Sequence, residues 1–448
     1  MKVVVIGAGI GGLVLAHGLR AAGVEVTVFE RDRAPADTGG YRLHLDAEAC
    51  EILDRRLPPA VCRALRASAA DPASFTRFSV WDHRLRPLLH FPRRPTPSAL
   101  LIGRIPLRTL LCEGLHETVR FGREFTRSSV SADGKVTAYF AKGAPVQGDL
   151  LIGADGARSR VAPALAGRPT AHPLTARGVA GRTPLTTAVR RLLPPAITCG
   201  PGFAIGPGGT GMFLSAHTPG TEVEQSDIAP VLESPYLLWG ITTTEPETGE
   251  EHPLEDAQAL LHRWSPAARA LLDLADPASG TSFPYFAADP TKGLMPWPAG
   301  RVTALGDAVH AMPPTGGRGA ATAVRDADLL TERIIDVHRG VTPVNTAMAR
   351  YQGGVEGYAH EALRESLQPL IWQRRLRHPL AYHVARPALK VTGAAIRLRS
   401  ALAGSALRDR GGEPVVGQRE QVPRTAEFRD RAVGDDHPVP VFQQGLGL

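Results

Sequence analysis

Cysteine and lysine are scarce in this chain. The four cysteines, Cys50, Cys62, Cys112 and Cys199, are widely spaced and include no C-x-x-C pair. This spacing argues against a structural zinc site and a disulfide framework, and it is typical of a reducing cytoplasm. Only 5 of the 51 basic residues are lysine. We interpret this arginine bias as the imprint of a GC-rich genome rather than as a sign of nucleic-acid binding.

Long apolar runs are also absent. No uncharged apolar run approaches the roughly 20 residues that cross a bilayer. The N-terminal stretch MKVVVIGAGIGG leads into a strand and a glycine turn and lacks the features of a signal peptide. We therefore expect a cytoplasmic protein without a transmembrane segment. At 448 residues the chain is too long for one small domain, so two or more lobes are predicted.

The net charge of +7 is concentrated near the C-terminus, because residues 364–410 alone have a net charge of +8. A basic helical face can bind membranes or nucleic acid. The alternative is a pair of helices whose arginines are solvated or paired with acids elsewhere. We favour the alternative, because Pro369, Pro379, Pro387 and Gly393 are expected to interrupt any long regular stripe.

The first 30 residues have the pattern of a βαβ unit. An apolar run over residues 2–6 leads into G-x-G-x-x-G, a helical stretch and a second apolar run that ends at Glu30. Gly7 makes the tight turn, Gly9 lets the backbone approach a pyrophosphate, and Gly12 lets helix and strand pack closely. The acid 18 positions after Gly12 can accept hydrogen bonds from a ribose. Together these features predict a binding site for an adenine dinucleotide.

The middle of the chain lacks this alternation of strand and helix. Residues 203–205 and 212–216 flank a glycine-rich turn, and 237–244 is a further strand-like run, so an antiparallel sheet is predicted. The turn itself, residues 206–211, precedes no helix, and we interpret it as a hairpin loop rather than a second phosphate motif. Residues 256–275 are predicted to be helical.

Two later motifs favour FAD over NAD. Asp155-Gly156 and Gly306-Asp307 each place an acid next to glycine at the end of an apolar run, and the second continues into a helix that begins at Gly319. A carboxylate at such a strand end can hold a ribityl hydroxyl. The helix start offers N–H groups to the pyrimidine edge of a flavin, which gains negative charge on reduction.

With these three motifs in this order, the chain resembles the class A flavoprotein monooxygenases of the para-hydroxybenzoate hydroxylase type. Arg104, in R-x-x-L-x-x-x-L, matches the helix-start arginine that lies near the cofactor in that family. Pro313-Pro314-Thr315-Gly316 resembles the loop that passes the flavin ring. The motifs span residues 1 to about 335.

The resemblance implies an α/β fold: a Rossmann-like FAD-binding domain with an inserted antiparallel-sheet substrate domain and a C-terminal helical region. The predicted segments are 1–72, 104–165 and 291–340 for the FAD-binding domain, 73–103 and 166–290 for the substrate domain, 341–410 for the C-terminal helices, and 411–448 for an irregular tail. A monomer or homodimer is expected.

The resemblance also implies which residues bind FAD. They are Gly7, Gly9, Gly12, Glu30, Arg31, Arg42, Arg104, Asp155, Asp307, Gly319 and Ala320. Asp155 belongs to a motif that the family uses for both FAD and NADPH, and it could instead cap the following turn. Arg104 could instead be a surface helix residue. Ala162 and Arg318 depart from the residues common in the family, which bears on how NADPH docks.

The implied chemistry belongs mainly to the cofactor. NADPH or NADH reduces the flavin, O₂ adds to give a flavin hydroperoxide, and one oxygen atom passes to the substrate by hydroxylation, epoxidation or Baeyer–Villiger insertion. We hypothesise an aromatic or polycyclic natural product as substrate, as in secondary metabolism or antibiotic biosynthesis. One alternative is a reductase or dehydrogenase that inserts no oxygen. A second is a flavin halogenase, but the W-x-W-x-I-P motif of halogenases does not occur in this sequence. A third is a non-enzymatic FAD-binding protein.

The candidate catalytic residues are Arg182 and Pro314, and the candidate substrate-binding residues are His217, Tyr236 and Trp239. The last three are polar or aromatic groups in strand-like stretches, where the alternative is a packing role. His310, beside the Gly-Asp motif, is predicted to be structural.

Overall fold

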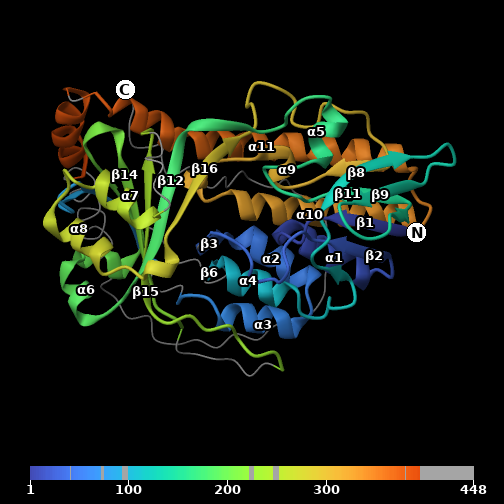
Figure 1. Ribbon diagram of the computed structural model, residues 1–448, viewed down its shortest axis with the longest axis horizontal. Coiled ribbons are helices and arrows are strands. Elements are labelled where there is room, and N and C mark those ends of the chain that lie inside the picture. Colours follow the sequence, from blue (N-terminus) through green and yellow to red (C-terminus); the bar gives the residue numbers. More distant parts are fainter. Residues whose placement is uncertain are drawn as a thin grey trace, which may run out of the picture.

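The computed structural model describes residues 1–40, 42–71, 75–92, 99–220, 227–245, 252–378 and 380–393. The predicted tail, 411–448, and the end of the predicted C-terminal helices lie outside the described residues. Figure 1 shows two large sheets at opposite ends of the long axis, with the helix α11 (Val344–Arg375) extending from one toward the other.

A five-stranded parallel sheet holds the first glycine motif, in the order β17-β11-β1-β2-β7. Its strands are β1 (Lys2–Ile6), β2 (Glu25–Phe29), β7 (Val119–Arg120), β11 (Leu150–Gly153) and β17 (Val302–Ala304). Val3 and Val5 pack in the main helical core, whereas Val4 and Ile6 pack in a second cluster on the other face. Both faces are therefore covered, which explains the continuous apolar run of β1.

The cover over Val4 and Ile6 is a small antiparallel sheet that the sequence analysis did not predict. It consists of β8 (Phe125–Val130), β9 (Val136–Phe140) and β10 (Val146–Gly148). Val136 and Ala138 of β9 are buried in the same cluster as Val4 and Ile6.

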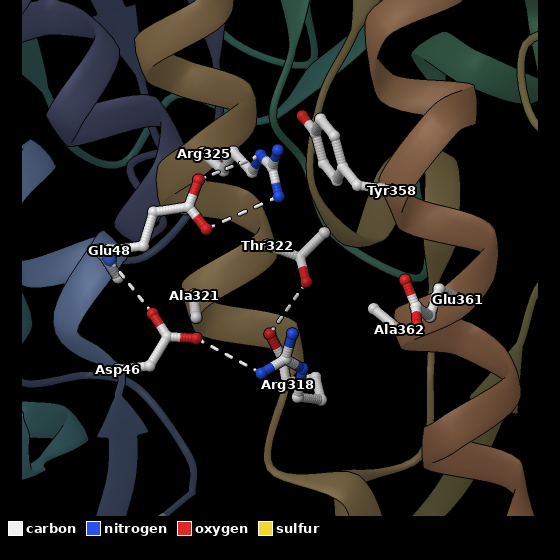
Figure 2. Close-up of a pocket in the computed structure, with 10 residues that line it drawn as sticks. Asp46, Glu48, Arg318, Ala321, Thr322, Arg325, Tyr358, Glu361 and Ala362 are labelled. Carbon is white, nitrogen blue, oxygen red and sulfur yellow. Dashed lines mark hydrogen bonds and ion pairs between the residues drawn. The ribbon is translucent and has the colours of Figure 1, made fainter. Parts of the chain in front are cut away.

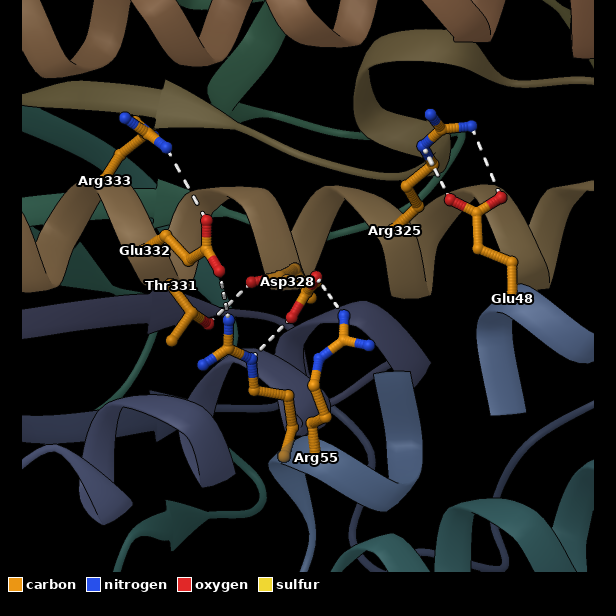
Figure 3. Close-up of polar contacts among 9 residues, drawn as sticks. Glu48, Arg55, Arg325, Asp328, Thr331, Glu332 and Arg333 are labelled. Atoms are coloured by element: carbon orange, nitrogen blue, oxygen red, sulfur yellow. Dashed lines mark hydrogen bonds and ion pairs between the residues drawn. The ribbon is translucent and has the colours of Figure 1, made fainter. Parts of the chain in front are cut away.

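Helices α1 (Ile10–Ala21), α2 (Ala47–Arg56) and α10 (Gly319–His338) pack together on the opposite face of the parallel sheet. A Cβ on Gly18 of α1 would lie 2.7 Å from the Cγ2 of Thr331, so glycine permits this close crossing. The Arg55 guanidinium of α2 pairs with Asp328 of α10 at 2.8 Å (Figure 3). Arg56 pairs with the same carboxylate. These pairs fix α2 against α10.

Shorter elements link this face to the rest of the molecule. They are β3 (Arg42–Leu45), α3 (Pro59–Ala67), β6 (Leu100–Gly103), α4 (Arg104–Leu111), α5 (Val161–Ala166) and α9 (Asp307–His310). Strands β3 and β6 pair antiparallel, so Arg42 lies opposite Gly103, immediately before Arg104.

The second large sheet has seven strands in the order β16-β12-β15-β14-β13-β4-β5. They are β4 (Arg77–Asp82), β5 (Pro87–Pro92), β12 (His172–Pro184), β13 (Gly202–Ile205), β14 (Gly211–His217), β15 (Tyr236–Thr243) and β16 (Thr281–Ala287). All pairings are antiparallel except that of β13 with β4. Residues 206–211 connect β13 to β14 as a hairpin, as predicted.

Helices α6 (Thr187–Leu192), α7 (Pro253–Leu260) and α8 (Pro266–Asp273) contribute to a core on one face of this sheet. The prediction of a single helix over 256–275 was wrong, because the segment contains parts of two helices, α7 and α8. The Ser265 hydroxyl accepts a hydrogen bond from the Ala268 amide and caps α8, and Pro266 occupies its first turn. A serine N-cap followed by proline is a helix start, so it divides the segment in two.

Two of the C-terminal prolines do not interrupt the helices as predicted. Pro369 lies inside the 32-residue α11, and residues 380–393 form a further helix that includes Pro387. No helix among the described residues is long and apolar enough to cross a membrane. The predicted fold class is confirmed: a Rossmann-like parallel sheet, a separate antiparallel sheet and a C-terminal helical region.

Candidate functional site

The turn between β1 and α1 contains two glycines that the fold requires and one that it does not. Gly7 has φ +106°, and a Cβ there would lie 2.2 Å from the carbonyl oxygen of Ala154. A Cβ on Gly12 would lie 2.3 Å from the carbonyl oxygen of Gly7. A Cβ on Gly9 would meet nothing closer than 3.8 Å. No contact in the described part of the chain therefore explains Gly9, and the space beside it would allow the close approach of a pyrophosphate.

The N-terminus of α1 is suited to an anion. Gly9 is its N-cap, no side chain caps it, and its first turn contains no acidic residue. The backbone N–H groups of this turn and the helix dipole therefore favour a phosphate group.

Glu30 lies beside this turn and is almost fully buried. Its Oε2 accepts a hydrogen bond from the Ala8 amide at 2.7 Å, and its Oε1 accepts one from the Asp32 amide at 3.0 Å. Arg108 pairs with Glu30 at 3.1 Å and donates from Nε to the Ala8 carbonyl at 2.9 Å. A carboxylate has about four lone-pair positions, so Glu30 retains acceptor capacity for a ribose hydroxyl.

Sequence reasoning missed Arg108, although it lies inside the motif quoted for Arg104. The signal was its position: four residues after Arg104 places it one turn further along α4, facing the core.

The exposed Arg31 follows Glu30 directly in the chain.

Asp307 follows Gly306 at the end of β17 and the start of α9. Solvent reaches the Asp307 side chain, but the surrounding protein raises the pKa of its carboxyl by desolvation, which nearby His310 and Arg104 oppose. Desolvation likewise lowers the pKa of Arg104, and Asp307 opposes that shift. The two charges thus act on each other across the site, although they come from segments about 200 residues apart.

Two further predicted FAD residues lie close to this acid. A Cβ on Gly319 would lie 3.6 Å from Oδ1 of Asp307, so the start of α10 adjoins the carboxylate. No side chain caps α10, and its first turn contains no acid. Ala320, the second residue of α10, is partly buried against the main core. Pro314, a candidate catalytic residue, lies exposed in the loop that precedes α10.

A buried network holds the Gly306-Asp307 turn from behind. The Gly306 amide donates to Oδ2 of Asp326 at 2.7 Å, and the His310 ring contacts the same oxygen at 2.7 Å. The Tyr358 hydroxyl donates to Oδ1 of Asp326 at 2.6 Å. Burial lowers the pKa of His310, but Asp326 outweighs this effect and the pKa is raised overall. His310 is fully buried, which supports the structural role predicted for it.

Asp155 uses its carboxylate within its own turn. Oδ1 accepts a hydrogen bond from the Ser159 hydroxyl at 2.6 Å, and Oδ2 accepts from the Arg160 amide at 2.7 Å. These contacts are those of a cap at the start of α5. The capping alternative stated for Asp155 therefore describes its geometry in this structure.

One face of the seven-stranded sheet carries most of the predicted substrate residues. The His217 ring stacks on Tyr236 with centroids 4.8 Å apart, and the Arg182 guanidinium lies 4.6 Å from the Tyr236 ring centroid. Arg182 also pairs with Glu233 at 2.7 Å, an acid that the sequence analysis did not single out. Burial, with Arg42 and Arg182 nearby, lowers the pKa of His217 to about 3, so the imidazole is neutral.

Arg42 reaches this face from β3. Its guanidinium donates to the Ser215 hydroxyl at 3.1 Å and to the Ala216 carbonyl at 2.7 Å. The Arg42 Nε and both His217 ring nitrogens are buried and have no hydrogen-bond partner within the described part of the chain. Such groups are rare in native structures and call for an explanation such as a ligand.

Trp239 was wrong as a substrate-binding candidate. It is fully buried in the core formed with α6, α7 and α8, and its Nε1 donates to the Thr183 hydroxyl at 3.2 Å. Side chains alternate across a strand, so Trp239 and Tyr236, three residues apart, point to opposite faces. The composition of β15 does not reveal which face packs against α6, α7 and α8.

A small cavity of about 60 Å³ lies between α2, α10 and α11 (Figure 2). Arg318 pairs there with Asp46 at 3.2 Å, and Arg325 pairs with Glu48 at 3.2 Å. The volume is far below the roughly 300–1,000 Å³ of ligand pockets. Arg318, the departure noted in the sequence, thus helps to hold the loop before α10 against α2.

A family model described as an FAD binding domain matches residues 1–353. The chain therefore belongs to this family of FAD-binding flavoproteins, and the residues at the β1–α1 turn, Glu30 and Asp307 fit that cofactor. The resemblance to flavoprotein monooxygenases predicted from the motifs is confirmed by the relatives described next.

Three curated relatives illustrate the match. The chain is 30% identical over 374 residues to the dual O-methyltransferase/FAD-dependent monooxygenase elcB of Phaeosphaeria nodorum, covering 73% of this chain and 39% of that protein. It is 28% identical over 335 residues to zeaxanthin epoxidase of Oryza sativa, covering 72% and 47%. It is 28% identical over 358 residues to aurachin C monooxygenase/isomerase of Stigmatella aurantiaca, covering 79% and 84%. The chain thus spans less than half the length of the first two.

Solved structures agree in fold. A putative FAD containing monooxygenase from Photorhabdus luminescens matches with a TM-score of 0.70 and 27% identity, covering 84% of this chain and 98% of that one. Klebsiella pneumoniae HpxO, complexed with FAD and uric acid, matches with a TM-score of 0.69 and 20% identity, covering 87% and 92%. The second likeness concerns the fold alone.

Proposed function

We propose that the chain is an FAD-dependent monooxygenase that consumes NADPH or NADH and transfers one oxygen atom of O₂ to an aromatic or polycyclic, natural-product-like substrate. The observation that supports this most is the position of Arg42. It is one of the residues predicted to bind FAD, and it donates hydrogen bonds to β14, on the sheet face of His217 and Tyr236. Cofactor site and substrate face therefore adjoin.

The residues on the cofactor side have distinct tasks in this proposal. The N–H groups at the start of α1 bind the pyrophosphate, and the absent side chain of Gly9 lets it approach. Glu30 accepts a ribose hydroxyl, and Asp307 accepts a ribityl hydroxyl. When bound, FAD supplies electron transfer from the nicotinamide and activation of O₂.

The residues on the substrate face orient the substrate and exclude water. The neutral His217 offers one donor and one acceptor, and the Arg182 guanidinium, held over Tyr236, offers further donors. Apolar area on the same face accepts a ring system, since Phe213 of β14 is only partly buried. The names of the relatives, which include zeaxanthin and aurachin C, support a natural-product substrate over a small charged benzoate.

The test is to purify the protein, record its absorbance spectrum and follow NADPH consumption in air with aromatic polyketides, quinolones and terpenoids. We expect a flavin spectrum, NADPH consumption accelerated by a substrate, and one ¹⁸O atom from ¹⁸O₂ in the product. A yellow protein that oxidises NADPH but places no oxygen in any product would favour the reductase alternative. A protein that cannot be loaded with FAD would refute the cofactor assignment.

A further inference from the structure

The helix formed by residues 380–393, here called the C-terminal surface helix, is attached to the molecule along one face. Tyr382 is buried in a cluster with Leu88 and Leu89 of β5, and its hydroxyl lies 2.7 Å from the His83 ring nitrogen. A Cβ on Gly393 would lie 2.4 Å from the Leu88 carbonyl oxygen, so the helix approaches β5 closely. Arg386 pairs with the buried Asp82 at the end of β4. This face is therefore fixed on the β4–β5 hairpin.

The opposite face of the same helix is apolar and open to solvent. Leu380, Val384 and Val391 are 69%, 70% and 70% exposed. Their spacing of four and seven residues places them on one side of the helix, and Pro387, also exposed, lies between them. Exposed large apolar side chains are unremarkable when scattered singly, but a row of them marks an interaction surface.

The chain around this apolar row is basic and contains no acid. From residue 366 to residue 408 the sequence has no Asp or Glu. Arg374, Arg375, Arg377 and Lys390 are exposed, and none of them forms an ion pair with an acid in the described part of the chain. Within α11, Ile371 adds a further exposed apolar side chain just before these cations.

We propose that the C-terminal surface helix, with the end of α11, binds the surface of a membrane that contains anionic lipids. Leu380, Val384 and Val391 enter the boundary between headgroups and acyl chains, and the neighbouring cations contact lipid phosphates. Interfacial helices combine these two features, an apolar face and basic residues without acids. A nucleic acid would use the cations but would leave the row of branched aliphatic side chains in water. The proposal does not depend on the oxygenase activity.

The test is co-sedimentation of the full chain with vesicles of phosphatidylglycerol and phosphatidylcholine, compared with vesicles of phosphatidylcholine alone. We expect binding to the anionic vesicles that weakens as salt is raised, because each cation near the surface strengthens binding about fivefold and this attraction is screened. Val384→Asp should reduce binding by at least about tenfold, since it removes an inserted side chain and places an acid at the lipid surface.

Val341→Asp is the matched control. Val341 is also 70% exposed, but it lies in the turn between α10 and α11, away from the C-terminal surface helix. It should leave vesicle binding unchanged. Thermal unfolding of both variants checks that the fold is intact, which we expect because both side chains are exposed. If Val384→Asp and Val341→Asp bind equally well, or if the unmodified chain binds neither type of vesicle, the proposal is wrong.

Two other results would also overturn it. A concentration-dependent dimer in solution that Val384→Asp abolishes would assign the apolar row to a second copy of the chain. Binding to a short DNA or RNA duplex that is lost on substitution of Arg374 and Arg377 but not of Val384 would assign the cations to nucleic acid.

Discussion

Arg108 and Glu30 form a nearly dry ion pair behind the first glycine turn. Their side chains are 5% and 9% exposed, and Arg108 also binds Asp32 and the Ala8 carbonyl. Removing one partner of such a pair leaves a buried charge without compensation, which costs far more than the pair itself contributes. The arginine therefore supports the turn that is predicted to hold the pyrophosphate, without itself being exposed to a ligand.

We predict that Arg108→Met lowers the free energy of unfolding by about 3–5 kcal/mol, measured by urea denaturation. Arg66→Met is the control, because Arg66 forms a similar pair with Asp54 in which both side chains are 44% exposed. An exposed pair contributes only about 0–1 kcal/mol. If the two variants lose the same free energy of unfolding, burial of the pair between Arg108 and Glu30 does not add to the cost of removing the arginine, and the prediction is wrong.

His217 makes a second prediction at this scale, concerning pH. Its folded pKa of about 3 lies below the ordinary value of 6.5, so below pH 6.5 the unfolded chain binds a proton that the folded chain does not. This group therefore costs stability as pH falls from 6.5 toward 3. Between pH 8 and pH 5 the cost reaches about 2 kcal/mol.

His217→Gln should remove that cost, so the difference in unfolding free energy between variant and parent should shift in favour of the variant by about 2 kcal/mol from pH 8 to pH 5. Any constant loss from the buried amide cancels in this comparison. Parallel pH profiles for parent and His217→Gln would contradict the prediction.

At the scale of the element, the β1–α1 turn separates the needs of folding from those of binding. Gly9 has an ordinary φ of −76° and room for a Cβ at van der Waals distance, whereas Gly7 has φ +106° and a carbonyl oxygen in the way. Glycine is thus required at position 7 by the backbone conformation of the fold, whereas at position 9 it is explained by the proposed binding of a pyrophosphate.

We predict that Gly9→Ala leaves the unfolding temperature of the FAD-free protein unchanged within error but weakens FAD binding by at least about tenfold, or 1.4 kcal/mol. The added methyl group would occupy space that a pyrophosphate needs. Gly7→Ala should instead destabilise the protein itself by more than about 1 kcal/mol, because its backbone conformation is incompatible with a Cβ. Flavin fluorescence titration and calorimetry measure the two effects. If Gly9→Ala binds FAD with unchanged affinity, the assignment of the pyrophosphate to this turn is wrong.

At the scale of the whole molecule, the seven-stranded sheet has one face for packing and one for the proposed substrate. Trp239 and the helices α6, α7 and α8 form the packed side, and Tyr236, His217 and Arg182 lie on the other side, next to Arg42 of β3. Residues three positions apart on β15 therefore lie on opposite faces, one of which packs against helices and the other of which is proposed to bind the substrate.

We predict that Tyr236→Phe raises KM for the substrate by about fivefold and lowers the free energy of unfolding by about 1 kcal/mol. The Tyr236 hydroxyl donates to Oε2 of Glu233 at 3.3 Å, and Glu233 in turn holds Arg182, so the variant loosens this group of side chains. Trp239→Phe should lower the unfolding free energy by about 1–3 kcal/mol through a cavity and a lost hydrogen bond, and leave KM unchanged. Steady-state kinetics and denaturation of both variants test this together. If KM increased for Trp239→Phe but not for Tyr236→Phe, the substrate would bind on the face of Trp239, and the proposed substrate face would be wrong.

Local patterns determined much of this protein from the sequence alone. The strand, glycine turn, helix and acid of the first 30 residues were predictable because each depends on neighbours within a few positions. The Gly306-Asp307 turn and the hairpin over 206–211 were predictable for the same reason. The helix break at Ser265 was also encoded locally, by serine before proline, and was overlooked.

Only the tertiary structure decided which distant groups meet. The pairing of Arg108 with Glu30, of Asp326 with His310 and Gly306, and of Arg182 with Glu233 each joins different elements, so no spacing in the sequence announces it. Alternation of side chains along a strand could have separated Tyr236 from Trp239, although both were predicted to bind the substrate. Which face is packed depends on where α6, α7 and α8 settle, and that is a property of the folded molecule.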